Sequence, residues 1–291
     1  MGGTPLRGHS TAAPASHRQA PRTNWGRASH AEVPGLFLRD TAAPPRQVSA
    51  MFELELQDDG LARLRLARPE ARNAVPAAGW DRLGACAGEA VARGVRLLLV
   101  EGNRAAFCAG ADLRDFEPLC GDVRAAGEFR RAMRRGLDAL AALPVPVVAL
   151  VEGPCYGAGV ALALACDIRL AGPGAAFAIT PARMGISFPQ EDVGRLVAVV
   201  GRGMAARLLF TAASIEAQEA LRIGLVDGFA DELDALCSLM LENEPASIAA
   251  LKRGIALAEV GRMSDGDQDR TFDALLASEG LAHRLAARRR R

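Results

Sequence analysis

Apolar and polar residues alternate in two neighbouring segments, residues 52–56 and 62–67. The string Asp58-Asp59-Gly60 between them is typical of a tight turn, so the pattern predicts a β-hairpin. Continuous apolar runs at 97–100 and 147–151 predict strands that are buried on both faces. Shorter runs predict two more strands, at 168–171 and 176–179.

Helical spacing of apolar residues follows the predicted hairpin and then dominates the second half of the chain. The predicted helices cover residues 77–92, 123–142, 157–165, 190–200, 203–211, 214–222, 231–242, 246–258 and 268–288. Strands and helices alternate first and helices follow, which predicts an α/β fold with a helical C-terminal segment. We divide the chain into an N-terminal extension (1–50), a core (51–240) and the C-terminal helices (241–291).

Residues 1–50 are rich in Pro, Ala, Ser and Arg and carry no acidic residue before Glu32. They lack apolar periodicity, so we predict a disordered extension or a reading frame that starts too early, with Met51 opening the first patterned segment. An Arg-rich, acid-poor start is also found in organelle targeting peptides, which remains the alternative.

Composition excludes several classes of function. The formal net charge is +1, so no overall field attracts nucleic acid or an anionic membrane. No apolar run approaches the roughly 20 residues of a membrane-spanning helix. The six cysteines form no CxxC pair and have no histidine at ligand spacing, so we expect small buried side chains in a reducing cytoplasm and no metal site.

The positions of the four histidines limit the catalytic chemistry. His9, His17 and His30 lie in the extension and His283 lies in the last predicted helix. A Ser-His-Asp or Cys-His unit therefore has no base in the predicted core. Proton transfer there has to use a carboxylate, a tyrosine, a thiol or water.

Two stretches of small residues each come shortly after an apolar run. The first is AAFCAGADL at 105–113, and the second is GPCYGAG at 153–159, which precedes a predicted helix. Small residues let backbone N–H groups approach a ligand closely. Two such turns supply what a two-donor oxyanion hole requires.

These stretches belong to a longer set of motifs. The set comprises LARPEARNAV (66–75), AFCAGADLRDF (106–116), PVPVVALVEGPCYGAGVALALACDIRLAG (144–172), ARMGI (182–186), TAASIEAQEALRIGLVD (211–227), PASIAALKRGIA (245–256) and FDALLASEGLAHRL (272–285). In this order and spacing they resemble the crotonase (enoyl-CoA hydratase/isomerase) superfamily from about residue 52 to residue 288. The resemblance implies a spiral of ββα units, assembly as trimers or dimers of trimers, and an acyl-CoA thioester substrate whose enolate is held by two backbone N–H groups. Coenzyme A would be part of the substrate, and no separate cofactor is implied.

The resemblance also assigns residues. The two N–H donors fall on Ala111 and Ala158. Residues implied to contact coenzyme A or the acyl group are Arg72, Ala74, Ala109, Asp112, Leu113, Tyr156, Gly157 and Lys252. For Asp112 we favour capping of a helix start over a substrate contact. Arg72 and Lys252 bind phosphate or face solvent, and Tyr156 either donates a hydrogen bond or walls the pocket.

The sequence departs from the hydratases of this superfamily at both catalytic glutamates. Ala161 occupies the first of these positions, and Thr180-Pro181 stands where the second would lie in a Pro-Glu pair. Isomerisation or another enolate reaction, such as C–C cleavage or decarboxylation, is therefore favoured over hydration. Asp192 and Glu191 are candidates for a single base, although acids in a first helical turn more often act as caps.

The sequence bears on two other functions. The missing glutamates are compatible with an acyl-CoA binding protein that has little turnover. RNA binding, which some members show through a lysine-rich helix, is disfavoured, because helix 77–93 has only Arg82 and Arg93 as basic residues beside Asp81 and Glu89.

Overall fold

The computed structural model describes residues 51–289, all of which lie in one compact unit, Gln47–Arg291. The predicted N-terminal extension, residues 1–50, lies outside the described residues. The predicted boundary between core and C-terminal helices falls at the end of helix α6, whose last residue is Leu241.

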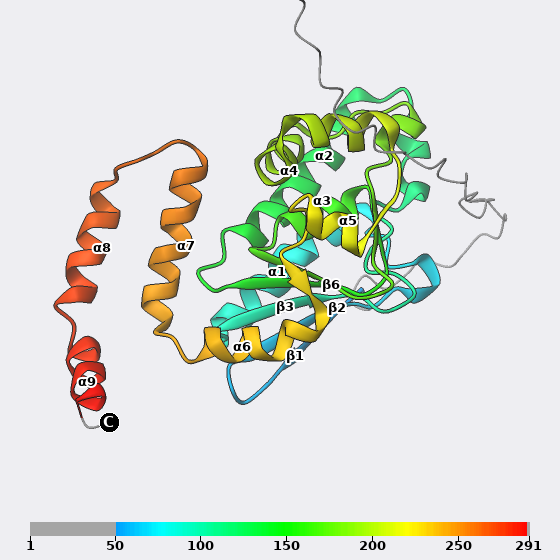
Figure 1. The fold of residues 1–291 in the computed structure, drawn as a ribbon. Coiled ribbons are helices and arrows are strands. Elements are labelled where there is room, and N and C mark those ends of the chain that lie inside the picture. The colour runs from blue at the N-terminus through cyan, green and yellow to red at the C-terminus, as the bar shows by residue number, and fades with distance from the viewer. Residues whose placement is uncertain (1–50, 290–291) are drawn as a thin grey trace, which may run out of the picture. The chain divides into compact units, whose positions relative to one another are not determined.

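A six-stranded sheet forms the centre of this unit (Figure 1). Its order is β1-β2-β3-β4-β6-β9, with an antiparallel β1–β2 hairpin and parallel pairing elsewhere. A smaller sheet has the order β5-β7-β8. The strands are β1 (Phe52–Leu56), β2 (Leu61–Leu66), β3 (Leu97–Glu101), β4 (Val147–Val151), β5 (Pro154–Tyr156), β6 (Ile168–Ala171), β7 (Ala176–Ala178), β8 (Ile215–Glu216) and β9 (Gly228–Phe229).

Helices separate most of the strands, as expected for parallel pairing, which needs crossover connections. The helices are α1 (Ala77–Ala92), α2 (Val123–Ala141), α3 (Ala158–Leu164), α4 (Gln190–Thr211), α5 (Ala217–Arg222), α6 (Leu233–Leu241), α7 (Pro245–Glu259), α8 (Gly266–Leu276) and α9 (Glu279–Arg288). Short 3₁₀ helices include η2 (Pro69–Ala71), η3 (Leu113–Asp115), η4 (Glu117–Leu119), η5 (Pro181–Met184) and η6 (Ala230–Glu232).

The larger sheet is covered on both faces, which explains its continuous apolar strands. Leu98 and Val100 of β3 face the main core, which also contains buried residues of α1, α2 and α3. Leu97 and Leu99 face the other side, in a smaller cluster with Leu233 and Cys237 of α6. Every residue of β3 and β4 is buried.

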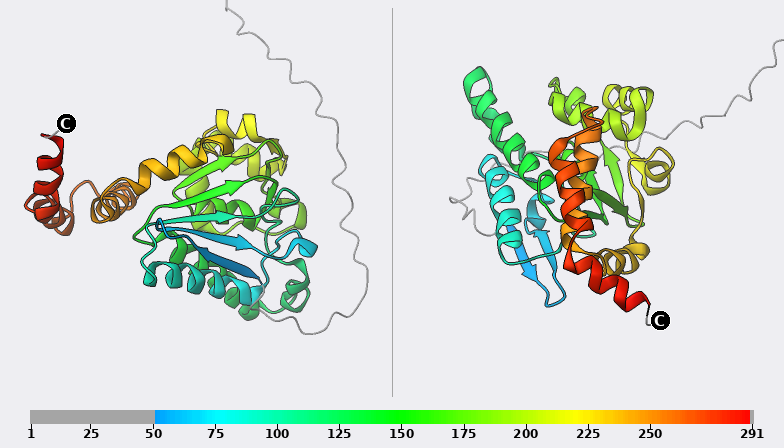
Figure 2. Two further views of the ribbon diagram at one scale, coloured as in Figure 1. Left: turned by 90° about the horizontal axis from the view of Figure 1, so that it is seen from below. Right: turned by 90° about the vertical axis from the view of Figure 1, so that its left-hand side faces the viewer.

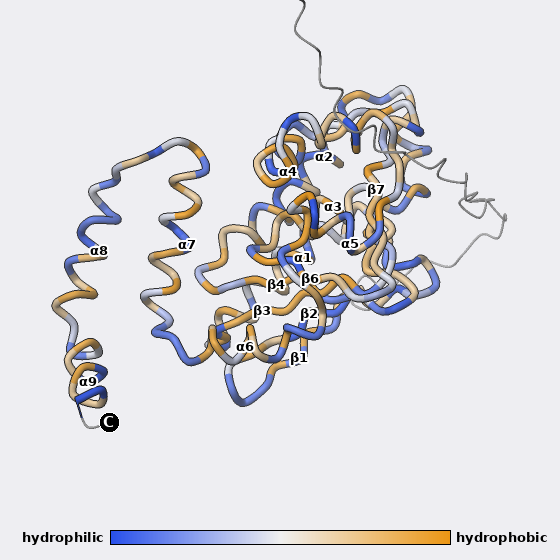
Figure 3. Tube along the Cα trace, in the orientation of Figure 1, coloured by the Kyte–Doolittle hydropathy of each residue, from blue (hydrophilic) through white to orange (hydrophobic). Residues whose placement is uncertain are grey.

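Helices α7, α8 and α9 follow the sheet in the chain, and the left view of Figure 2 shows α8 and α9 outside the body formed by the sheet and its covering helices. No residue within these three helices is buried. Their large exposed apolar side chains include Leu251, Ile255, Phe272 and Leu276. Figure 3 shows apolar and polar segments alternating along them.

The structure confirms the α/β fold with a helical C-terminal segment and corrects some of its details. The two helices predicted at 190–200 and 203–211 are counted as one, α4, but it breaks at Gly201 (φ 74°), between the two predicted ranges. The predicted helix at 214–222 begins three residues later as α5, because Ile215 and Glu216 pair as strand β8. The predicted helix at 268–288 is divided into α8 and α9. Within the described residues no helix is long and apolar enough to cross a membrane.

Candidate active site

The two small-residue turns predicted from the sequence lie against each other. Cys108 and Cys155 form an isolated parallel β-bridge. The Cys108 amide donates to the Pro154 carbonyl (3.2 Å), and the Tyr156 amide donates to the Cys108 carbonyl (2.9 Å). The turn after β3 is thus hydrogen-bonded along β5, which leads into the second turn.

Two glycines permit this close approach. A Cβ at Gly159 would lie 2.3 Å from the carbonyl oxygen of Cys108. A Cβ at Gly110 would lie 2.8 Å from the Tyr156 carbonyl oxygen and 3.2 Å from the amide nitrogen of Ala158. Gly110 also has a φ of +104°, which other residues rarely adopt. A side chain at either glycine would push the two turns apart.

The amides of Ala111 and Ala158 stand next to this contact. The Gly110 carbonyl accepts from the Val75 amide (2.8 Å) and the Asp112 amide donates to the Val75 carbonyl (3.0 Å), which fixes the backbone on both sides of Ala111. Ala158 is the first residue of α3, where amides have no partner within the helix. Neither amide has an acceptor within residues 51–289.

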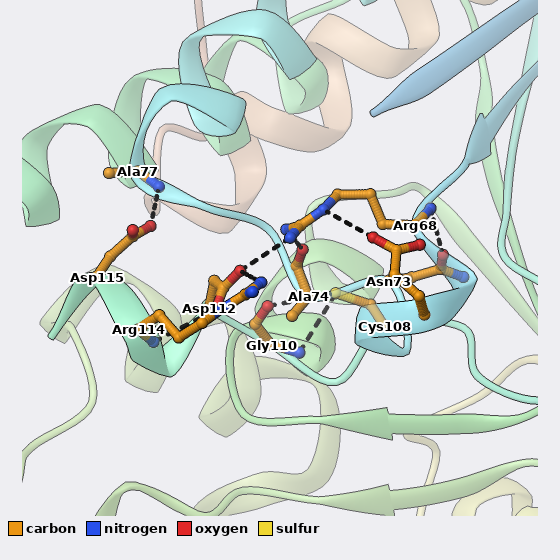
Figure 4. A network of polar contacts seen from close by, with 10 residues as sticks. Arg68, Asn73, Ala74, Ala77, Cys108, Gly110, Asp112, Arg114 and Asp115 are labelled. Carbon is orange, nitrogen blue, oxygen red and sulfur yellow. Dashed lines mark hydrogen bonds and ion pairs between the residues drawn. The ribbon is translucent and has the colours of Figure 1, made fainter. Parts of the chain in front are cut away.

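A buried ion pair lies beside the first turn (Figure 4). Arg68 Nη2 lies 3.0 Å from Asp112 Oδ2, and the two residues are 8% and 6% exposed. Arg68 Nη1 also donates to the Ala74 carbonyl (2.5 Å). Arg68 was not among the predicted site residues, because its partner Asp112 lies on another loop. The only sequence signal for Arg68 was its position within the motif at 66–75.

The loop that carries Arg72 is held in an uncommon conformation. Arg72 and Asn73 have φ angles of 49° and 57°, in the left-handed region. The Asn73 side chain accepts from the Arg68 amide (3.0 Å) and donates to the Ala106 carbonyl (2.8 Å). The Ala109 amide donates to the Arg72 carbonyl (2.9 Å). The loop and the first turn therefore form one hydrogen-bonded unit.

The structure confirms the capping role of Asp112. Its side chain accepts a hydrogen bond from the Arg114 amide at the start of η3. Burial alone would raise the pKa of the Asp112 carboxyl, but hydrogen bonds from Arg114 and Arg68 lower it to about 2. The nearby Asp115 accepts from the Ala77 amide at the start of α1 (2.6 Å).

The other predicted contact residues, apart from Lys252, lie on the same turns and loop. Arg72 is exposed, Leu113 opens η3, and Tyr156 ends β5 with its side chain half-buried. The Gly157 amide donates to the Ala178 carbonyl (2.8 Å), which ties the second turn to β7.

Lys252 is separated from them. Its Nζ donates to the Val145 carbonyl (2.9 Å) and to Asp167 Oδ2 (2.7 Å). Val145 precedes β4, whereas the second turn follows β4. Lys252 therefore lies near the opposite end of β4 from the two turns of its own chain. The sequence pattern identified the lysine but not the acidic partner that pairs with it.

Both positions of the missing glutamates carry side chains without acid–base chemistry. Ala161 is fully buried in α3. Pro181 is the first residue of η5, and Thr180 precedes it as the N-cap residue.

Asp192 lies in the first turn of α4, is 0% exposed and faces α2. Its Oδ1 accepts from Arg134 Nη1 (2.8 Å), and its Oδ2 has no hydrogen-bond partner in the described residues. Burial raises the pKa of this carboxyl, opposed by Arg134. Glu191 is exposed. Both acids lie in the first turn of α4, as the capping interpretation requires, but the Asp192 carboxylate is hydrogen-bonded to Arg134 rather than to a backbone amide of the helix.

The sequence pattern of the family described as enoyl-CoA hydratase/isomerase matches residues 57–264, more than half of the chain. The chain belongs to the enoyl-CoA hydratase/isomerase family.

Relatives and solved structures agree with this assignment. A probable enoyl-CoA hydratase of Mycobacterium tuberculosis, EchA17, is 31% identical over 251 residues, covering 82% of this chain and 95% of the relative. A family protein from Hyphomonas neptunium has a TM-score of 0.76 at 32% identity, covering 83% and 95% of the two chains. A protein from Streptomyces coelicolor, called a putative enoyl-CoA hydratase, has a TM-score of 0.73 at 30% identity, with 86% and 94% covered.

The cysteines of this enoyl-CoA hydratase/isomerase family member do not add a nucleophile to the turns. Burial raises the pKa of the Cys108 thiol to about 12, and burial also raises the pKa of Cys155. Cys120 is exposed, which corrects the expectation that all six are buried. Within residues 51–289 no group of His, Cys, Asp and Glu has the arrangement to hold a metal ion.

Proposed function

We propose that this family member stabilises the enolate of an acyl-CoA thioester between the backbone N–H groups of Ala111 and Ala158. The observation that carries the proposal is the contact of the two turns, with Gly110 against the Ala158 amide and with both amides lacking an acceptor in the described residues. A well-placed donor of this kind typically contributes about 3–4 kcal/mol to transition-state stabilisation.

The chemistry follows from where charge develops. Removal of a proton from the carbon next to the thioester carbonyl transfers negative charge to the carbonyl oxygen, which the two amides then hydrogen-bond. The substrate contacts that we propose are Arg72, Ala74, Ala109 and Leu113 for coenzyme A, and Tyr156 and Gly157 for the acyl group. Coenzyme A belongs to the substrate, and the proposal requires no resident cofactor.

Isomerisation or another enolate reaction fits these residues better than simple hydration, although the relatives are called hydratases. Ala161 and Pro181 offer no carboxylate. We assign the proton transfer to Asp192, because its raised pKa and unpartnered Oδ2 suit an acid that takes a proton from one carbon and returns it to another. Glu191, exposed and adjacent, is the second candidate.

The exposed apolar face of α7, α8 and α9 supports assembly with further copies of the chain, as a trimer or a dimer of trimers. Side chains such as Ile255 and Phe272, each 64% exposed, are costly to leave in water. An interface between protomers would bury them.

Gly110→Ala tests the oxyanion proposal. The new Cβ would collide with the Tyr156 carbonyl and the Ala158 amide, so we expect kcat to fall about 100- to 1,000-fold, the typical effect of losing one such donor. The assay follows thioester absorbance with crotonyl-CoA and a 3-enoyl-CoA. Gly88→Ala on α1 is the matched control, because a Cβ there has nothing within 4 Å.

The same assay separates turnover from binding alone. If no thioester of the panel reacts, while butyryl-CoA still raises the melting temperature of the wild-type protein, the chain is an acyl-CoA binding protein. That alternative is supported by the absence of carboxylates at positions 161 and 181. Equal kcat values in Gly110→Ala and wild type would contradict the assignment of the two amides.

A further inference from the structure

Thr180 lies beside the second turn, and its hydroxyl is not used to cap the helix that follows. Strand β7 ends at Ala178, whose carbonyl accepts from the Gly157 amide (2.8 Å), so the segment after β7 is held at this turn. Thr180 is half-buried and is the N-cap residue of η5, but its side chain makes no capping hydrogen bond there. A threonine at an N-cap commonly makes that bond, so this hydroxyl is available to another partner.

The backbone of Gly157 relates this hydroxyl to the Ala158 amide. Gly157 has a φ of 52° and a ψ of −119°. At this ψ a Cβ on residue 157 would be nearly eclipsed with the nitrogen of residue 158, so it would point to the same side as the Ala158 N–H and crowd an acceptor of that amide. Apart from adjoining residues of the chain, Thr180 Oγ1 is the single described atom within 4 Å of this Cβ position, at 3.4 Å. The Thr180 hydroxyl therefore borders the space in front of the Ala158 N–H.

A hydroxyl in this place can supply what the two amides supply. It carries a hydrogen to donate and no charge, so it stabilises a negative oxygen without the repulsion that a carboxylate would bring. Donors aimed at the place where charge develops have their largest effect in the transition state. The oxygen proposed to accept from Ala111 and Ala158 would lie in the space that the Thr180 hydroxyl borders.

We infer that the Thr180 hydroxyl donates a third hydrogen bond to the thioester oxygen, and that this bond is strongest when the oxygen carries the negative charge of the enolate. The inference rests on the proposed enolate chemistry at Ala111 and Ala158. It gives a catalytic role to a residue that the sequence marked only by its lack of a carboxylate.

Acetoacetyl-CoA tests the inference without turnover, because this 3-oxoacyl thioester loses a carbon-bound proton to give an enolate that absorbs ultraviolet light. A pH titration of the ligand bound to the full-length protein measures the pKa of the bound ligand. We expect the wild type to lower this pKa relative to free acetoacetyl-CoA, since each donor favours the enolate. Thr180→Val keeps the branched shape without the hydroxyl, so the acid dissociation constant of the bound ligand should fall about 10- to 100-fold, the usual effect of one hydrogen bond to a charged group.

Steady-state rates should change in the same way. With a thioester that the wild type converts, Thr180→Val should lower kcat about 10- to 100-fold and change KM less than about threefold, because the lost bond acts mainly in the transition state. Thr180→Ser keeps the hydroxyl and should retain both kcat and the acid dissociation constant within about threefold. Thr211→Val is the matched control, because Thr211 is exposed at the end of α4 and its hydroxyl donates to the Arg207 carbonyl (2.7 Å), so this variant should behave as the wild type.

The outcomes separate the two proposals. If Thr180→Val enolises bound acetoacetyl-CoA as the wild type does, while Gly110→Ala does not, the third donor is overturned and the two amides remain assigned. Equal losses in Thr180→Val and Thr180→Ser would also overturn it, because the shape of the side chain and not its hydroxyl would then be responsible. If the wild type leaves the pKa of acetoacetyl-CoA at its value in free solution, the proposed function fails and the inference fails with it.

Discussion

Two buried arginine–aspartate pairs in this protein have the same chemistry and different surroundings. Asp112 is hydrogen-bonded by Arg68 and Arg114 on both oxygens, and it holds the backbone of the first turn. Asp192 is hydrogen-bonded by Arg134 on one oxygen only. A fully paired network rigidifies its surroundings, whereas a partly paired one lowers stability unless a ligand completes it. We therefore interpret the first pair as a scaffold and the second as part of the proposed proton-transfer site.

Removing the arginine of each pair should have the largest effect at the scaffold. Arg68→Met is expected to lower the free energy of unfolding by about 3–5 kcal/mol, the usual loss when a buried pair is broken. Arg134→Met should cost less than half as much, because burial has already raised the pKa of Asp192 and the carboxyl can take up a proton. Urea unfolding of both variants at pH 7 measures the difference, and equal losses would contradict the comparison.

Removing the charge of Asp192 should act on catalysis instead. Asp192→Asn is expected to lower kcat at least about 100-fold, the lower end of what a positioned acid–base group contributes. Steady-state rates on an accepted thioester provide the measurement, with Glu191→Gln as the matched comparison. A larger loss in Glu191→Gln would transfer the proton-transfer role to Glu191, and unchanged rates in both would exclude this turn from the mechanism.

A fall in pH should change the contributions of Asp112 and Asp192 to stability in opposite directions. Burial of Asp112 is outweighed by hydrogen bonds from Arg114 and Arg68, so the pKa of Asp112 falls from 3.8 to about 2 in the folded protein. Its contribution, about 2 kcal/mol, is present above pH 4 and is lost as the pH falls towards 2. The raised pKa of Asp192 has the opposite sign, so its own contribution improves as the pH falls. Between pH 5 and pH 2, the free energy of unfolding should change less in Asp112→Asn than in the wild type. The same pH dependence in both proteins would refute the assignment.

The fold was predictable from the sequence where the signal is local. Helix α1 was predicted with its observed bounds, 77–92, because an apolar face, a preceding Pro76 and a following Gly94 all lie within a few residues. Strands β5, β8 and β9 were missed, since each has only two or three residues and exists by pairing with a distant segment. No alternation of two or three residues distinguishes such strands from a loop.

The candidate site was likewise predictable only where its sequence signal is local. The turns that carry Ala111 and Ala158 were visible as runs of small residues. Such runs indicate a local backbone conformation, so they can be recognised without knowing which distant residues they contact. Arg68 is 44 residues from Asp112, and Arg134 is 58 residues from Asp192. Nothing local marks such pairs, because only tertiary packing decides which charged side chains leave water together.

The order of the six strands across the larger sheet is the same as their order along the chain, and therefore the order of their synthesis. From β1 to β9, each new strand pairs at the free edge left by the one before it, and none has to be inserted between two strands that are already paired. A nascent chain can therefore extend the sheet from one side during translation. The last strand ends at Phe229, before synthesis reaches α7 at Pro245. The C-terminal helices therefore add no strand to this sheet.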